Sequence, residues 1–228
     1  MLLARIDRRH QLKWSLMAIC VALEVSNPAF ALDPASIARS GNGDAATACS
    51  SCHGDHGEGL PDNGFPRLAG LDSRYLRTQL EAFASGSRAN EIMHPIAKAL
   101  SSDERQSLAS YYSGLIAPKA PQQAVDDDKL IADGKSIALD GIWNKGLPGC
   151  SQCHAKLGLG VGASFPRLAG QSSTYIGNSL AAWKDGSRGN DPLSLMAGIA
   201  SKLDQSQIDA VAAYYGSLPV DQPEGKTP

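Results

Sequence analysis

The chain has 228 residues, of which 43% are apolar, 19% are charged and only 6% are aromatic, and its formal net charge is −2. This length allows one or two domains. The composition is too apolar for a disordered chain, no apolar run reaches the roughly 18 residues of a membrane-spanning helix, and the charge excludes a basic surface for nucleic acid. We therefore expect a soluble globular protein. The 4 Phe, 3 Trp and 6 Tyr residues are few for a hydrophobic core, so another group is expected to fill the interior.

The first 31 residues have the pattern of a secretory signal peptide. Four basic residues within the first 13 precede an apolar stretch over residues 14–23, and Ala29-Phe30-Ala31 offers the small residues that a signal peptidase accepts. A short buried helix or an uncleaved anchor is the alternative, but the apolar run is only ten residues long and Asn27-Pro28 follows it. We expect residues 1–31 to be removed during export.

The rest of the chain is a tandem repeat with an offset of 100 to 103 residues. Cys49-Ser50-Ser51-Cys52-His53 recurs as Cys150-Ser151-Gln152-Cys153-His154, and Phe65-Pro66-Arg67-Leu68-Ala69-Gly70 recurs unchanged from Phe165 to Gly170. Further landmarks recur in the same order: Tyr75 with Tyr175, Gly86-Ser87-Arg88 with Gly186-Ser187-Arg188, Met93 with Met196, and Tyr111-Tyr112 with Tyr214-Tyr215.

A segment with two prolines and three aspartates separates the two copies, which is typical of a boundary between domains. We therefore predict the following order along the chain: a signal peptide over 1–31, a first domain over 32–117, a linker over 118–128, a second domain over 129–218 and a C-terminal tail over 219–228.

Both copies have the periodicity of short helices, and neither shows convincing strand alternation. Asp72 is predicted to cap a helix that ends near Gly86, with Tyr75, Leu76, Leu80 and Phe83 on one face, and the second copy has the same pattern from Tyr175 to Trp183. Ser101 with Glu104, and Asp204 with Gln207, have the spacing of capping boxes that open C-terminal helices. The sequence predicts an all-α fold.

The cysteines and methionines indicate the chemistry. Beyond residue 31, the four cysteines all lie in the two Cys-x-x-Cys-His motifs, and the two methionines are Met93 and Met196, one in each copy. A Cys-x-x-Cys-His run is the attachment signal of c-type haem: the thiols of Cys49, Cys52, Cys150 and Cys153 would bind the porphyrin, and His53 and His154 would bind its iron. A methionine as the sixth ligand raises the reduction potential, as in electron-carrying cytochromes c.

Three other uses of the cysteines fit the sequence less well than haem attachment: zinc binding, dithiol redox chemistry and structural disulfides. The two pairs are 97 residues apart, whereas the pairs of a shared zinc site are usually separated by about 12 to 20 residues. A redox dithiol would need a βαβ context, and structural disulfides would account for neither the histidines nor the methionines.

With these motifs the chain resembles the dihaem cytochromes of the c4 type over nearly all of its mature length. The resemblance rests on the paired Cys-x-x-Cys-His motifs, the Phe-Pro-Arg-Leu-Ala-Gly block, the methionine loop and the Tyr-Tyr helix. It implies two tandem class I cytochrome c domains, each wrapped around one covalently attached haem. It also implies a periplasmic electron carrier of the respiratory chain, either free or associated with the membrane surface.

The resemblance further implies residues that surround the haem. The carbonyl oxygens of Pro66 and Pro166 would accept the free N–H of the ligand histidines, which orients the imidazole. Arg67, Arg167, Tyr75 and Tyr175 are candidates to bind haem carboxylates, although either arginine could instead lie on the solvated surface.

An alternative axial ligand exists in the first copy. His94 follows Met93, and His56 lies three residues beyond His53. The second copy has Ala197 in place of His94 and still keeps its methionine, which favours methionine in both copies.

Three classes of function fit two such haems. The leading one is a carrier that passes single electrons from a quinol–cytochrome c reductase toward a terminal oxidase, with no small-molecule substrate. The second is the dihaem cytochrome subunit of a periplasmic dehydrogenase. The third, a dihaem peroxidase, needs a haem with an open coordination site, and a methionine in each copy argues against it.

Overall fold

The computed structural model describes residues 33–43, 46–116 and 127–220, which belong to one compact unit. The predicted signal peptide over 1–31, most of the predicted linker and most of the predicted tail lie outside the described residues. We call residues 33–116 lobe 1 and residues 127–220 lobe 2, because each contains one copy of the repeat.

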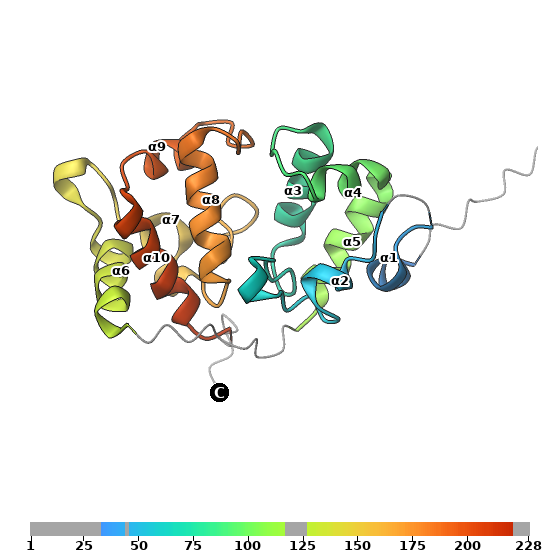
Figure 1. Cartoon of the computed structure of the whole chain (residues 1–228), viewed down its shortest axis with the longest axis horizontal. Helices are drawn as coiled ribbons and strands as arrows, with labels where there is room; N and C mark the ends of the chain where they lie inside the picture. The colour runs from blue at the N-terminus through green and yellow to red at the C-terminus, as the bar shows by residue number, and fades with distance from the viewer. Residues whose placement is uncertain (1–32, 44–45, 117–126, 221–228) are drawn as a thin grey trace, which may run out of the picture. The chain divides into compact units, whose positions relative to one another are not determined.

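Both lobes consist of short helices joined by loops (Figure 1). Lobe 1 contains α1 Pro34–Ser40, α2 Ser50–His53, η1 Pro61–Asn63, α3 Ser73–Ser85, α4 Met93–Ala99 and α5 Ser102–Gly114. Lobe 2 contains α6 Asp128–Asp140, η2 Trp143–Lys145, α7 Ser151–His154, η3 Lys156–Gly158, α8 Ser173–Asp185, α9 Leu195–Ala200 and α10 Gln205–Ser217. The described residues form isolated bridges but no strand, so the predicted all-α fold is confirmed. No helix in this part of the chain is long and apolar enough to cross a membrane.

The predicted helix ends are confirmed where a side chain caps them. Asp72 accepts hydrogen bonds from the backbone at the start of α3, and Gly86 ends this helix in the left-handed region, with a φ of 82°. Ser101 with Glu104, and Asp204 with Gln207, form complete capping boxes at the starts of α5 and α10. Each such cap is worth on the order of 1 kcal/mol.

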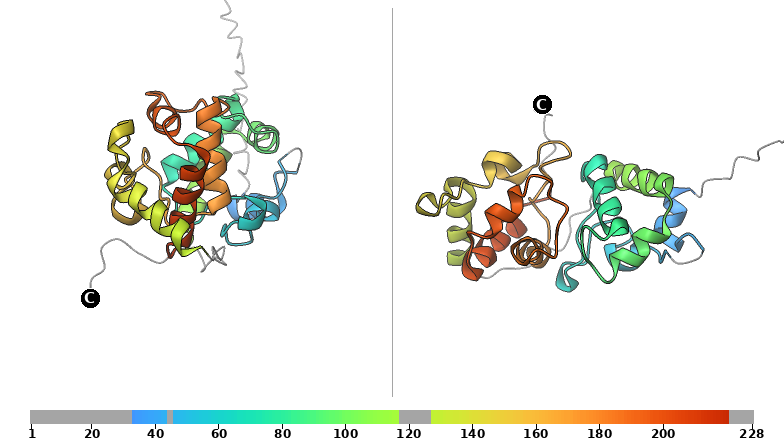
Figure 2. Two further views of the ribbon diagram at one scale, coloured as in Figure 1. Left: turned by 60° about the vertical axis from the view of Figure 1, so that its left-hand side comes forward. Right: turned by 90° about the horizontal axis from the view of Figure 1, so that it is seen from above.

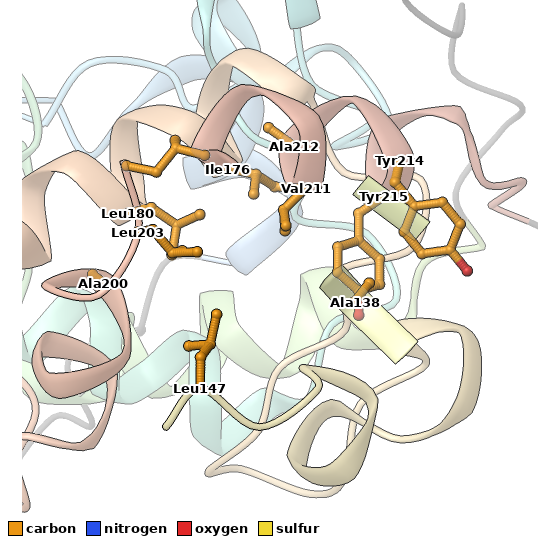
Figure 3. Packing of buried hydrophobic residues seen from close by; sticks show 11 residues of the cluster. Ala138, Leu147, Ile176, Leu180, Ala200, Leu203, Val211, Ala212, Tyr214 and Tyr215 are labelled. Carbon is orange, nitrogen blue, oxygen red and sulfur yellow. The ribbon is translucent and has the colours of Figure 1, made fainter. Parts of the chain in front are cut away.

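Each lobe has its own apolar core. In lobe 1 the core joins α1, α3 and α5, and it includes Ile37, Leu76 and Leu108. In lobe 2, α8 and α10 pack together (Figures 1 and 2). Figure 3 shows Ile176, Leu180, Leu203 and Val211 turned toward the same space at the centre of this lobe.

The first helix differs between the lobes. Helix α1 has 7 residues, whereas α6 has 13. Helix α6 lies against α10 at Gly134, where an added Cβ would be only 1.9 Å from the carbonyl oxygen of Ala210. This glycine therefore lets α6 cover its lobe more closely than an L side chain would permit.

Candidate functional site

The two Cys-x-x-Cys-His motifs form single helical turns, α2 and α7. Cys49 precedes α2, and the backbone N–H of His53 donates to the carbonyl oxygen of Cys49 at 2.9 Å. Cys150 and His154 have the same bond at 2.9 Å in lobe 2. Residues three and four apart on a turn lie on one face, so both thiols and the imidazole of each motif are presented together, as attachment of one planar group requires.

The four cysteines of the two motifs are free thiols in the structure, which argues against structural disulfides between them. Burial raises the pKa of the Cys150 thiol to about 11 and also raises that of Cys49. A redox-active dithiol needs a lowered pKa. These two cysteines therefore have the environment of buried attachment sites and not of a catalytic dithiol.

A hydrogen bond to a proline carbonyl orients the imidazole ring of His53 and that of His154. His53 donates from Nδ1 to the carbonyl oxygen of Pro66 at 2.8 Å, and His154 donates in the same way to Pro166 at 2.8 Å. Both imidazoles are buried, and this burial lowers their pKa values against the opposing effect of the proline carbonyls. Each ring is therefore neutral, with Nε2 left to bind a metal.

A glycine in each lobe lets the histidine segment and the proline segment cross at backbone distance. The N–H groups of Gly59 and Gly160 donate to the carbonyl oxygens of His53 and His154, both at 2.8 Å. Gly160 has a φ of 88°, and an added Cβ would lie 2.7 Å from the backbone nitrogen of Arg167. The crossing therefore has no room for an L side chain.

We expect Gly160→Ala to lower the free energy of unfolding of the holoprotein by clearly more than Gly186→Ala. Gly186 has a φ of 82° but nothing within 4 Å of an added Cβ, so its substitution costs only the left-handed strain of about 1–2 kcal/mol. Denaturant unfolding followed by haem absorbance measures both variants. Equal losses of stability in the two variants would show that the close backbone crossing at Gly160 adds nothing to the cost of its substitution.

Lobe 2 contains a large apolar cavity in front of α7. It encloses about 1070 Å³ including its mouth, and it is lined by Cys150, Cys153, His154 and Met196 together with apolar side chains of α8, α9 and α10. Residues of lobe 1, namely Leu71 and Tyr75, also reach its wall. The predicted thiols, histidine and methionine of the second copy thus meet in one space.

The chemistry of this cavity fits a haem. Its wall is mainly apolar, as a porphyrin requires. The indole Nε1 of Trp183, which also lines the cavity, is buried and has no hydrogen-bond partner among the described residues. Such an orphaned donor is costly unless a ligand supplies an acceptor, and the carboxylates of a haem are acceptors.

The predicted methionines lie at the starts of helices. Met93 begins α4 and Met196 is the second residue of α9. Asn90 accepts from the backbone N–H of Met93 at 2.7 Å, and Asp191 accepts from that of Met196 at 2.6 Å. The sequence predicted a loop around both methionines and not the short helices α4 and α9, which have 7 and 6 residues. Asn90, three residues before Met93, has the spacing of a helix cap and could have indicated α4, whereas Asp191 lies five residues before Met196.

The two histidines considered as alternative ligands are placed differently. His94 lies close to its own lobe's α3, with Nδ1 2.7 Å from the carbonyl oxygen of Phe83. His56 is exposed at the surface of lobe 1. Methionine as the axial ligand in lobe 1 stays a prediction.

Of the arginines and tyrosines predicted near the haem, Arg67, Tyr75 and Tyr175 take part in contacts between the lobes, and Arg167 has a contact within lobe 2. Arg67 is only 2% exposed and donates to the carbonyl oxygens of Ala69 at 2.8 Å and Ala169 at 3.1 Å, so it does not lie on the solvated surface. Arg167 is half-buried and donates to the carbonyl oxygen of Val220. Tyr75 and Tyr175 accept hydrogen bonds from arginines of the other lobe.

Comparison with known proteins covers both lobes. The cytochrome c family model matches residues 39–115 and 131–219. A thiosulfate dehydrogenase electron acceptor from Stutzerimonas stutzeri strain A1501 is 44% identical over 208 residues, which are 90% of this chain and 94% of the relative.

Two solved structures are also similar. A thiosulfate dehydrogenase from Marichromatium purpuratum, in its as-isolated form, has a TM-score of 0.77 and 36% identity over 82% of this chain, which spans only 40% of that chain. Reduced cytochrome c4 from Pseudomonas stutzeri has a TM-score of 0.68 and 32% identity, covering 75% of this chain and 93% of that one.

Proposed function

Because the chain belongs to the cytochrome c family and carries two covalent haems c as an electron carrier, we propose that it is the dihaem electron acceptor of a thiosulfate dehydrogenase. The observation that carries this proposal is the 44% identity to a thiosulfate dehydrogenase electron acceptor, of which 94% of the length is matched. The likeness to a solved thiosulfate dehydrogenase supports it further. The expected resemblance to cytochrome c4 is confirmed.

Each residue of the second haem site would have a separate role in electron transfer. Cys150 and Cys153 would hold the second haem, the Pro166 carbonyl orients His154, and Met196 faces the same cavity. When bound, the haem iron takes up and releases one electron. The apolar wall of this cavity would exclude water, so that little solvent rearranges on each transfer. In lobe 1 the Pro66 carbonyl orients His53 in the same way, and Cys49, Cys52 and Met93 would hold the haem for a second electron.

A signal-like N-terminus would bring the protein into the compartment of its donor and acceptor. We propose that residues 1–31 direct export and that the protein works in the periplasm, where covalent attachment prevents loss of the cofactor. A thiosulfate dehydrogenase catalytic subunit in that compartment would be the donor, and a terminal oxidase or another redox protein would take the electrons onward.

The runner-up function is a c4-like carrier between a quinol–cytochrome c reductase and a terminal oxidase, which the likeness to cytochrome c4 favours. Stopped-flow mixing of the oxidised holoprotein distinguishes the two. We expect a thiosulfate dehydrogenase catalytic subunit with thiosulfate to reduce both haems much faster than a quinol–cytochrome c reductase with quinol does. Faster reduction by the quinol–cytochrome c reductase would contradict the proposal and support the runner-up.

A further inference from the structure

The two Gly-Ser-Arg segments of the repeat contact each other across the two lobes. The N–H of Ala89 donates to the carbonyl oxygen of Ser187 at 3.0 Å, and the N–H of Gly189 donates to that of Ser87 at 2.8 Å. This pair of bonds forms an antiparallel bridge at Arg88 and Arg188. The bridge brings the two arginines together at the boundary between the lobes.

Each guanidinium lies over an aromatic ring of its own lobe and donates to a tyrosine of the other. Arg88 is 4.5 Å from the ring centre of Phe83 and donates to the hydroxyl of Tyr175 at 3.0 Å. Arg188 is 3.7 Å from the ring centre of Trp183 and donates to the hydroxyl of Tyr75 at 3.4 Å. The contacts of Arg88 and Arg188 are therefore nearly symmetric, as expected of a repeat.

Gln79 of α3 breaks the symmetry. Its Oε1 accepts from Arg88 at 2.9 Å, from Arg188 at 3.1 Å and from the side chain of Asn190 at 2.8 Å. The residue at the equivalent position in α8 is Ser179, whose shorter side chain has no amide to offer. One neutral oxygen therefore holds both arginines.

Within the described residues, no carboxylate neutralises the two arginines of this cluster. Arg88 and Arg188 are 8% and 5% exposed. Burial alone would raise the pKa of Tyr175, but Arg88 and Arg188 lower it to about 7. The cluster is thus a buried site of positive potential, and ionisation of Tyr175 would compensate one of its two positive charges.

The cluster borders the haem cavity of lobe 2. Arg188, Tyr75 and Tyr175 all line that cavity. An oxidised haem carries one more positive charge than a reduced one, and charges inside a protein interact strongly because the medium is poorly polarisable. Buried cations at the wall therefore favour the reduced form.

We propose that Gln79 is a positioning residue that holds Arg88 and Arg188 beside the second haem cavity without neutralising them, and thereby raises the reduction potential. A glutamate at this position would be nearly isosteric but would cancel one of the two charges. This role is independent of which redox protein supplies the electrons.

The test is a spectroelectrochemical titration of the Gln79→Glu holoprotein. We expect the mean of the two midpoint potentials to fall, while thermal stability is retained or increased because the two arginines would pair with a carboxylate in place of a neutral amide oxygen. Thr78→Glu is the matched control, since Thr78 is the exposed neighbour on the same helix, and it should leave the potentials nearly unchanged.

A second variant tests the proposal if the Gln79→Glu protein does not fold. Arg188→Gln removes one charge and keeps an amide at the bridge, so the mean potential should again fall. Unchanged potentials in either variant, or an equal fall in Thr78→Glu, would overturn the proposal and leave Gln79 with a structural role only.

Discussion

Replacing Cys150 and Cys153 together by serine is expected to remove one haem and to destabilise lobe 2 strongly. Ile176, Leu180, Leu203 and Val211 belong to the core of this lobe and also line its cavity. The enclosed part of that cavity has a volume of about 130 Å³. An empty cavity costs about 24 cal/mol per Å³, so leaving this volume unfilled would cost about 3 kcal/mol. That is a large share of a total stability of about 5–15 kcal/mol.

The haem content of this double variant should fall from two to one per chain, measured by haem absorbance against protein mass. Its thermal transition, followed by circular dichroism, should lose cooperativity and part of its helical signal. The Cys49→Ser and Cys52→Ser pair is the matched variant for lobe 1. A cooperative, native-like transition in the chain without haem would contradict the view that the cofactor is the principal aromatic group of each core.

The haem sites could be predicted from the sequence because their determinants are local. The thiols and the histidine of each motif lie within five residues, and a single turn brings them together. The caps at Asp72 and Ser101 are equally local, since each side chain binds a backbone group within three residues. Local contacts of this kind need no knowledge of the tertiary fold.

The charged cluster could not be predicted in the same way. The sequence repeat identified Arg88 and Arg188 only as landmarks, and Gln79 gave no signal, because the residues that it binds in lobe 2 are 109 and 111 positions away. The comparison of the two copies does contain one hint. Gln79 aligns with Ser179, and a polar difference on the buried face of an otherwise similar helix indicates a contact that only one copy makes.

Substituting the predicted axial methionines is expected to cause the largest change in redox behaviour. Met196→Ala removes the only thioether that lines the cavity of lobe 2 among the described residues. Thioether ligation favours the reduced iron, and axial ligands set haem potentials over a range of roughly 0.8 V. One of the two midpoint potentials should therefore drop by a large part of that range.

The absorption band near the red edge that comes from iron–sulfur charge transfer in the oxidised protein gives the assignment, and Met93→Ala is the matched variant in lobe 1. Each single substitution should remove about half of the band, and the double substitution should remove all of it. His94→Ala should leave the band intact, because the second copy has Ala197 in place of His94 and still keeps its methionine. If the full band persists in either single variant, that methionine is not a ligand, and in lobe 1 a histidine such as His94 becomes the better candidate.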